Sequence, residues 1–321
     1  MRKHSLYTSS FKETMNFILM LFLVAATFML WILHMMPQYS NEYTASILDK
    51  VERLESVNEP KIILVGNSNV PFGIDSETLE ETFNMPVVDM GLHGSLGNAF
   101  HENLAKFNVN KGDIVIVAHT TYYDTGVFGD PVLGWITLED HWHLWNAVDY
   151  KMMKQLIDNF PIYLKKVINL WSNEKGNLIP TGIYARTSFN EYGDIGVSRT
   201  ESKLDVEKAT VQMPSVGDDV AERLNQLNEY FTDRGAVMLI AAYPILNTSS
   251  TPDRQEFLEF QEKLENAMDA SVISEYTDYF FEPQYFYDVN YHLTDEGTVL
   301  RTNLLIEDIK RWDKQQIWVM Y

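Results

Sequence analysis

The chain has 321 residues and a formal net charge of -20, from 45 acidic and 25 basic side chains. Apolar residues make up 45% of the sequence, which is typical of a globular protein with a sizeable core and excludes a disordered chain. The acidic excess repels a phosphate backbone, so no nucleic-acid partner is expected. Because cysteine is absent, disulfides, thiolate metal sites and cysteine nucleophiles are excluded, while the redox compartment stays open.

An uncharged apolar run extends from Phe17 to Leu33, with basic residues before it and acidic residues after it. About 20 such residues span a bilayer as a helix. The positive-inside rule then predicts a cytoplasmic tail at 1–15, a membrane-spanning signal-anchor at 16–36 and an extracytoplasmic C-terminal domain on a single-pass protein of the cell membrane. A cleaved signal peptide is the alternative, although its apolar region is usually shorter and no small-residue cleavage site follows Leu33. A buried soluble helix is disfavoured because the run has no polar face.

Residues 37–60 are polar and charged, and we expect a partly helical stalk between the membrane and a folded domain at 61–312. In that domain, continuous apolar runs alternate with amphipathic helical segments, as in a sheet covered on both faces. This alternation predicts an α/β fold of three layers with a mostly parallel five-stranded sheet. The expected strands are at 62–65, 86–90, 113–118, 236–242 and 271–274, and the expected helices at 96–107, 219–234, 252–268 and 294–312.

The alternation breaks down between about 120 and 215, where a helical segment at 146–171 is followed by a loop-like stretch. An insertion above the active edge of a sheet can form a lid or a substrate platform. Its aromatic content fits plain packing equally well. The sequence leaves both interpretations open. Four of the seven tryptophans lie here: Trp135, Trp142, Trp145 and Trp171.

Two segments far apart in the chain carry the residues of a nucleophilic site. Ser68 directly follows the first expected strand, and Asp288 and His292 lie together on a late loop. A serine hydroxyl is a weak nucleophile until an imidazole takes its proton, and a carboxylate orients that imidazole. Because reactive groups gather at the carboxyl ends of parallel strands, we expect Ser68 as nucleophile, His292 as general base and Asp288 as its orienting partner. The structural alternatives are a turn cap, a hydrogen-bonded histidine before a helix and a turn aspartate.

These segments also carry a family resemblance. Gly66-Asn67-Ser68 after a strand, Gly91 after the next strand and the late Asp288–His292 segment resemble the SGNH/GDSL hydrolase superfamily. With its N-terminal anchor, the chain is similar to the membrane-anchored extracytoplasmic branch, which includes DltD-like proteins of lipoteichoic acid D-alanylation and polysaccharide O-acetylation proteins. The resemblance covers about residues 60–125 and 235–312, and it implies the flavodoxin-like three-layer fold of that superfamily.

The resemblance implies acyl transfer, with an acetyl or D-alanyl group moved to or from a cell-surface glycan or teichoic acid. It also implies a multi-pass membrane-bound O-acyltransferase as partner. The oxyanion would be bound by the backbone N–H groups of Ser68 and Gly91, or alternatively Gly94. Two features depart from the family pattern. The loop His119–Asp124 lacks the Gly-x-Asn donor, and the Asp288–His292 interval is four residues where three are usual.

Several alternatives stay open. Asn67 or Asn69 is a candidate replacement for the missing asparagine donor. A simple esterase, with water as the acceptor, uses the same triad. A non-catalytic surface protein that binds glycan or organises an assembly, on a degenerate fold of the same kind, is the alternative from another class. The segment Asp140–His143 has no third ligand at standard metal-site spacing, so neither a metal nor another cofactor is expected.

Overall fold

Five short strands form a sheet in which every neighbouring pair runs parallel. Their order is β2-β1-β3-β4-β6, so the direction of winding reverses between β1 and β3. In such sheets ligands bind outside the carboxyl ends of the strands at the reversal point. The computed structural model describes residues 10–35, 39–173 and 182–319. The strands are β1 (Ile62–Val65), β2 (Val87–Asp89), β3 (Ile114–Val117), β4 (Val237–Ile240) and β6 (Ser271–Val272).

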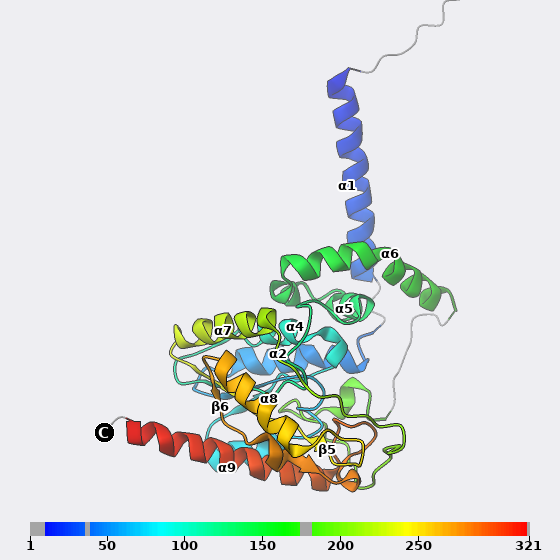
Figure 1. Ribbon diagram of the computed structural model, residues 1–321. Helices are drawn as coiled ribbons and strands as arrows, with labels where there is room; N and C mark the ends of the chain where they lie inside the picture. Colours follow the sequence, from blue (N-terminus) through cyan, green and yellow to red (C-terminus); the bar gives the residue numbers. More distant parts are fainter. Residues whose placement is uncertain (1–9, 36–38, 174–181, 320–321) are drawn as a thin grey trace, which may run out of the picture.

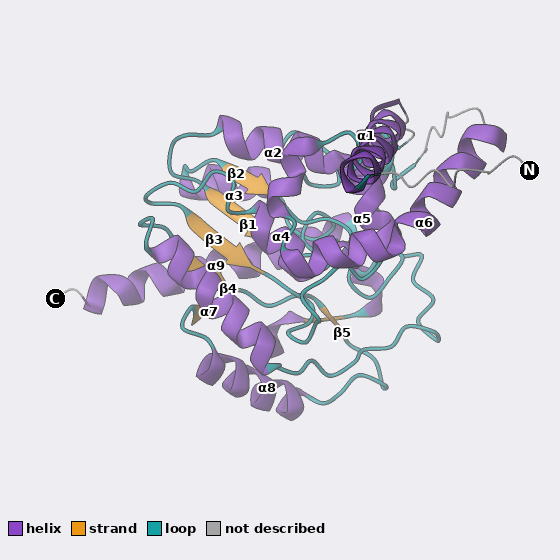
Figure 2. Cartoon of the chain, turned by 90° about the horizontal axis from the view of Figure 1, so that it is seen from above, coloured by secondary structure: helices purple, strands orange, loops and turns teal. Residues whose placement is uncertain are grey.

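Each strand is buried on both faces because successive side chains point to opposite sides of the sheet. Ile63 and Val65 enter one apolar core, whereas Ile62 and Leu64 enter the other. The first core is covered by α2, α4, α7 and α8, and the second by α3 and α9, which makes the sheet the middle of three layers (Figure 2). These helices are α2 (Ile47–Ser56), α3 (Ser76–Phe83), α4 (Asn98–Leu104), α7 (Asp218–Thr232), α8 (Arg254–Ala267) and α9 (Asp295–Val319).

The helix ends follow recognisable sequence signals. Asp253 and Glu256 form a capping box at the start of α8. Before α9, the hydroxyl of Thr294 accepts the backbone N–H of Gly297, which satisfies one free donor of the first turn. Gly235 stands between α7 and β4 with a φ of 74°, a left-handed conformation that other residues rarely adopt. The predicted α/β fold with a five-stranded parallel sheet is therefore confirmed, with α9 extending beyond the expected end at 312.

The expected stalk at 37–60 is wrong for the described residues 39–60. Ile47, Val51 and Leu54 recur on one side of α2 and are buried in the core of the sheet. This spacing is the apolar stripe of a packed amphipathic helix. The segment therefore belongs to the folded body. Residues 37 and 38 lie outside the described residues.

The insertion at about 120–215 packs mainly through its aromatic side chains. Trp135 stacks on Tyr163 with 5.3 Å between ring centroids, and its indole N–H donates to the carbonyl of Leu156. The predicted helix at 146–171 is present as α6, and a helix that the sequence did not reveal, α5, precedes it. A second, two-stranded parallel sheet lies outside the main sheet. The bounds are α5 (Pro131–Leu138), α6 (Tyr150–Asn173), β5 (Ile245–Leu246) and β7 (Phe280–Phe281).

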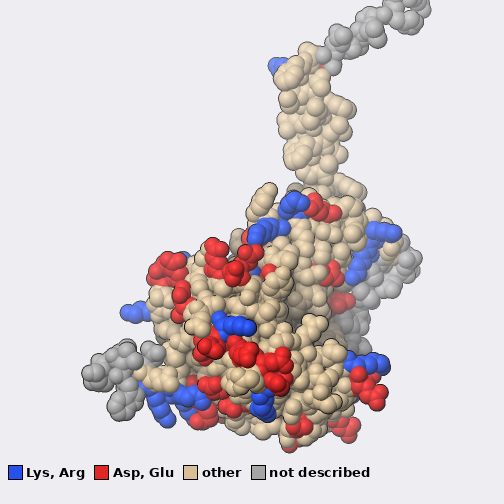
Figure 3. All heavy atoms as spheres, in the orientation of Figure 1, with Lys and Arg blue, Asp and Glu red and all other residues tan. Residues whose placement is uncertain are grey.

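A single long helix, α1 (Phe11–Met35), projects from the body (Figure 1). Its stretch Phe11–Trp31 is long and apolar enough to cross a membrane, and a signal sequence has the same character. Side chains such as Leu19 and Leu23 are exposed, and the space-filling view shows almost no charge along the helix (Figure 3). Of the expected tail and anchor, residues 1–9 and 36 lie outside the described residues.

A buried ion pair links the amino ends of β1 and β3, on the side of the sheet opposite the strand ends that lead to Ser68. Lys61 Nζ lies 3.0 Å from Asp113 Oδ2, and both side chains are fully buried. Asp113 Oδ1 also accepts the backbone N–H of Lys61. Removing one partner of such a pair leaves an uncompensated charge in the core, which typically costs about 3–5 kcal/mol.

We expect Asp113→Asn to lower the free energy of unfolding by about 3 kcal/mol, because Lys61 loses its counter-charge. Adding Lys61→Met removes the stranded charge, so the double variant should recover more than half of that loss. Urea unfolding of the full-length chain in detergent, followed by tryptophan fluorescence, measures both. A double variant no more stable than Asp113→Asn alone would contradict this account.

Candidate active site

Ser68, His292 and Asp288 form a continuous hydrogen-bonded chain at the carboxyl edge of the sheet. The hydroxyl oxygen of Ser68 lies 2.8 Å from Nε2 of His292. On the other side of the ring, Nδ1 lies 2.8 Å from Oδ1 of Asp288. With the ring proton on Nδ1, His292 donates to Asp288 and Nε2 accepts the hydroxyl of Ser68. The structure thus brings together the three side chains that the sequence singled out.

A tight turn after β1 presents Ser68. The backbone N–H of Val70 donates to the carbonyl of Asn67, and the N–H of Phe72 donates to that of Ser68. At Gly66, an added Cβ would lie 2.6 Å from Val70 and 2.9 Å from the carbonyl of Ala118. Only glycine allows this close approach between the turn and the end of β3. Ser68 is consequently held, half-buried, at the point where the sheet reverses its winding.

Asn67 and Asn69 hold the turn through their side chains. The amide of Asn69 donates to the carbonyl of Ala118 at 2.9 Å and to Oδ1 of Asn67 at 2.8 Å. The amide of Asn67 donates to the hydroxyl of Thr120 at 2.6 Å. Both donors of the Asn69 amide are therefore engaged within the protein, which speaks against Asn69 as the replacement for the missing oxyanion donor, whereas the Asn67 amide has one donor engaged by Thr120.

Arg301 of α9 holds this turn in place through hydrogen bonds to Asn69. Its guanidinium is buried and donates to both the backbone carbonyl and the side-chain oxygen of Asn69. Burial lowers the pKa of Arg301 to about 10, so the side chain stays charged at neutral pH and depends on these acceptors. The residue after Ser68 is thus tied to the helix that starts three residues after His292.

The loop before α9 folds back on itself and places Asp288 beside His292. The N–H of His292 donates to the carbonyl of Val289, and the N–H of Tyr287 donates to the carbonyl of His292. This closed loop accommodates the spacing of four positions from acid to base, so the longer interval does not separate them. The imidazole also stacks on Phe72, with 3.7 Å between centroids and 10° between planes. Two different segments therefore fix the ring.

Tyr184, from the insertion, is a site residue that the sequence did not indicate. Its hydroxyl donates to Oδ2 of Asp288 at 2.5 Å. Its ring contacts Tyr43 and Phe72 with centroids 5.8 Å and 6.0 Å apart. Part of the insertion therefore completes the site, in addition to the part that serves packing. No local pattern marks Tyr184, because its partner is 104 residues away.

The electrostatics of the site favour a neutral imidazole beside an ionised carboxylate. Burial lowers the pKa of His292 below its ordinary value, although the hydrogen bond and charge of Asp288 oppose the shift. Burial alone would raise the pKa of Asp288, but hydrogen bonds from His292 and Tyr184 outweigh it and the pKa falls below its usual value. At neutral pH this is the protonation state that a general base requires.

Gly91 lies next to the turn that carries Ser68, but its N–H is already bonded within the protein. That N–H donates to Oδ1 of Asp89 at 2.6 Å. The backbone N–H of Ser68 has no acceptor within the part of the chain that the structure describes. Of the two backbone donors expected for an oxyanion, Ser68 is thus free and Gly91 is occupied.

His119, after β3, and His143, in the segment Asp140–His143, pair with different acidic residues. His119 contacts Glu102 at 3.0 Å, whereas His143 contacts Glu55 at 2.7 Å. Over residues 10–35, 39–173 and 182–319, no group of three His, Cys, Asp or Glu side chains is arranged to hold a metal ion.

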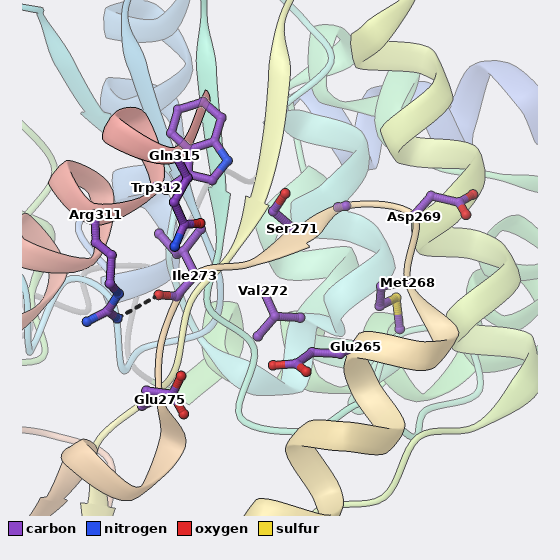
Figure 4. Close-up of a pocket in the computed structure, with 11 residues that line it drawn as sticks. Glu265, Met268, Asp269, Ser271, Val272, Ile273, Glu275, Arg311, Trp312 and Gln315 are labelled. Carbon is purple, nitrogen blue, oxygen red and sulfur yellow. Dashed lines mark hydrogen bonds between the residues drawn. The ribbon is translucent and has the colours of Figure 1, made fainter. Parts of the chain in front are cut away.

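A separate pocket of about 430 Å³ lies along the edge strand β6, between α8 and α9. Figure 4 shows Glu265, Asp269 and Trp312 around it, with Arg311 donating to the carbonyl of Ile273. None of the expected site residues lines it. The hydrogen-bonded chain at Ser68 is therefore a different place from this hollow.

No family model and no curated protein sequence matches the chain. The SGNH/GDSL resemblance and the roles of the site residues accordingly stay predictions. Their physical support is the geometry around Ser68.

Gly91 and Gly94 differ sharply in the space available for a side chain. An added Cβ at Gly91 would lie 2.7 Å from both Val70 and Pro71, in the nucleophile turn, whereas at Gly94 the nearest atom is Asn67 Cβ at 3.6 Å. We expect Gly91→Ala to lower the free energy of unfolding by about 1–3 kcal/mol through overpacking. Gly94→Ala is the matched control and should change it by less than about 0.5 kcal/mol. Equal effects in thermal unfolding would show that Gly91 is not limited by this contact.

Proposed function

We propose that the protein is a membrane-tethered, SGNH-like serine acyltransferase or esterase. It acts on acetyl or D-alanyl groups of a cell-surface polysaccharide or teichoic acid, outside the cytoplasm. The observation that carries the proposal is the chain of two 2.8 Å hydrogen bonds through His292. A serine in this relation to an imidazole and a carboxylate is activated for attack on a carbonyl. A histidine that only fills the core has no need of a serine hydroxyl on one ring nitrogen and a carboxylate on the other.

The same three side chains act in both halves of the reaction. Ser68 Oγ attacks the acyl carbonyl carbon while Nε2 of His292 takes its proton. Asp288 stabilises the resulting imidazolium and keeps the ring oriented. The tetrahedral intermediate expels the donor alcohol, which receives the proton from His292 and leaves an acyl-Ser68 ester. An acceptor hydroxyl then attacks the ester carbonyl and gives its proton to His292, which passes it to Ser68 Oγ as the Ser68 ester bond breaks. Water as acceptor gives hydrolysis instead of transfer.

The position of the site in the chain supports a substrate at the membrane surface. Tyr43 follows the last residue of α1 by eight positions, and its ring contacts Tyr184, which holds Asp288. Eight residues span at most about 28 Å. A site this close to the anchor suits an acyl donor delivered by a multi-pass membrane-bound O-acyltransferase. It also suits an acceptor polymer attached near the bilayer.

A non-catalytic surface protein that binds glycan or organises an assembly is the second candidate. The observation in its favour is the incomplete oxyanion site: the N–H of Gly91 is occupied by Asp89, and the loop after β3 has no Gly-x-Asn. Losing one such donor typically costs about 10²–10³ in rate. The serine chemistry and this alternative differ in whether turnover depends on Ser68.

We expect Ser68→Ala to abolish hydrolysis of a chromogenic acetyl ester by the full-length chain in detergent, with a loss on the order of 10⁴-fold or more. Mass spectrometry should find an acyl or fluorophosphonate adduct on Ser68 of the unaltered chain. Ser271→Ala is the matched control, since Ser271 is exposed on the edge strand. Absence of any Ser68-dependent turnover or adduct, with acetyl and D-alanyl donors alike, would refute the catalytic proposal and favour the binding protein.

The pH dependence follows from His292 as the base. Its pKa lies below the ordinary value of 6.5, so kcat/KM should rise with pH through an ionisation below 6.5 and stay level above it. Asp288→Asn removes the charge that favours the imidazolium, so the inflection should move to more acidic pH while the plateau falls by about 10⁴-fold. An inflection above 6.5, or an alkaline shift in Asp288→Asn, would contradict the assignment of His292 as base.

A further inference from the structure

Helix α6 carries a stripe of apolar side chains on its outer side. Tyr150, Ile157 and Ile168 are 82%, 63% and 47% exposed. Tyr150 and Ile157 stand 7 residues apart, which is two helical turns, so they project from one side of the helix before Pro161, and Ile168 is exposed on the part of α6 after Pro161. The opposite side of α6 is buried in the body through Met152, Leu156, Tyr163 and Val167. The exposed stripe is therefore additional to the packing face.

The same helix is basic, although the chain as a whole carries a charge of -20. Between Tyr150 and Asn173 it contains four lysines and one acidic residue, Asp158, a balance of +3. Asp158 pairs with one of the lysines, Lys154, at 2.6 Å. Apolar residues flanked by lysines are typical of helices that lie in the interface of a membrane with anionic lipids. The lysines of α6 are Lys151, Lys154, Lys165 and Lys166.

Contacts of the residues that follow α1 place α6 close to the C-terminal end of α1. Tyr39 is buried in the body, its ring lies 5.9 Å from the ammonium of Lys166, and its N–H donates to Glu139. Glu139 also accepts the hydroxyl of Tyr163 on α6. From Met35, the last residue of α1, to Tyr39 is four residues, a reach of at most about 14 Å. Figures 1 and 2 both show α6 beside the base of α1.

We propose that α6 lies on the lipid surface, with its apolar stripe at the boundary of headgroups and acyl chains and its lysines on anionic lipid phosphates. The proposal depends on α1 remaining in the bilayer, and it is independent of the chemistry at Ser68. Lysine stems cover apolar surface while their ammonium groups reach the headgroups, and each lysine near an anionic surface adds attraction. Figure 3 shows basic side chains around the base of α1.

A lipid surface suits this helix better than a second copy of the chain. An interface between two copies would bring the same patch together with itself. The lysines of both helices would then face one another, and like charges in contact oppose association. An anionic lipid surface instead matches the charge of the helix.

This contact would give the body a second attachment besides α1. One helix leaves the body free to rotate about the membrane normal and to tilt, whereas a helix lying on the surface sets the tilt. Tyr43, four residues after Tyr39, contacts Tyr184 at the site. The height and direction of Ser68 relative to the bilayer would follow from the two attachments together.

The absence of cysteine allows a single-cysteine spin label at a chosen position. We would label Ile157→Cys in the full-length chain, reconstituted singly into nanodiscs of phosphatidylcholine with or without phosphatidylglycerol. Val299→Cys is the matched control, since Val299 is 54% exposed. It lies on α9, a helix at the side of the body away from α1 in Figure 1. Electron paramagnetic resonance compares collisions of the label with oxygen, which concentrates in lipid, and with a water-soluble nickel chelate. Intact mass verifies that α1 is retained.

At position 157 the ratio of oxygen to nickel collisions should be severalfold higher than at position 299, and higher again with phosphatidylglycerol. Adding Lys151→Glu and Lys165→Glu should remove the increase that phosphatidylglycerol causes. An aqueous ratio at position 157 in both lipid mixtures would overturn the proposal. So would dipolar coupling between labels of two copies in detergent, before reconstitution, or recovery of a chain that has lost α1. Ester turnover is not used as a readout, so this test and the test of Ser68 fail separately.

Discussion

The contact between the buried guanidinium of Arg301 and Asn69 is the constraint on which the site depends. A charged group without solvent must be satisfied by acceptors, and Asn69 supplies both its backbone and its side-chain oxygen. Asn69 follows Ser68 directly, and Arg301 lies in the first turns of the helix that begins just after His292. One interaction therefore holds the turn that carries Ser68 against the loop that carries His292, although the two residues are 224 positions apart in the chain.

The surroundings of His292 fit the predicted triad more closely than the backbone donors fit the predicted oxyanion site. His292 has a partner on each nitrogen and an aromatic ring against its face, which fixes both its tautomer and its plane. Of the two backbone donors first expected for an oxyanion, the N–H of Ser68 has no acceptor among the described residues, whereas that of Gly91 donates to Asp89.

Segments outside the sheet complete the site and connect it to the residues that follow α1. Tyr184 comes from the insertion and Tyr43 from the segment expected to be a stalk, yet their rings touch and Tyr184 holds Asp288. The segment after α1 packs on α6 through Tyr39. These contacts link the residues after α1, the insertion and Asp288, although the three segments are far apart in the chain.

By itself the sequence determined the elements whose signals are local. The strands followed from continuous apolar runs, the start of α9 from Thr294, and the candidate triad from polar residues at strand ends and on one late loop. Tertiary structure alone decided that Asp288 reaches His292 despite the spacing of four positions, and that Gly91 donates to Asp89. It also decided that Tyr184 and Arg301 support the site. Residues 39–60 read as a stalk because their buried face becomes apparent only against the sheet. Contacts between residues far apart in the chain leave no local pattern, whereas periodicity and capping do.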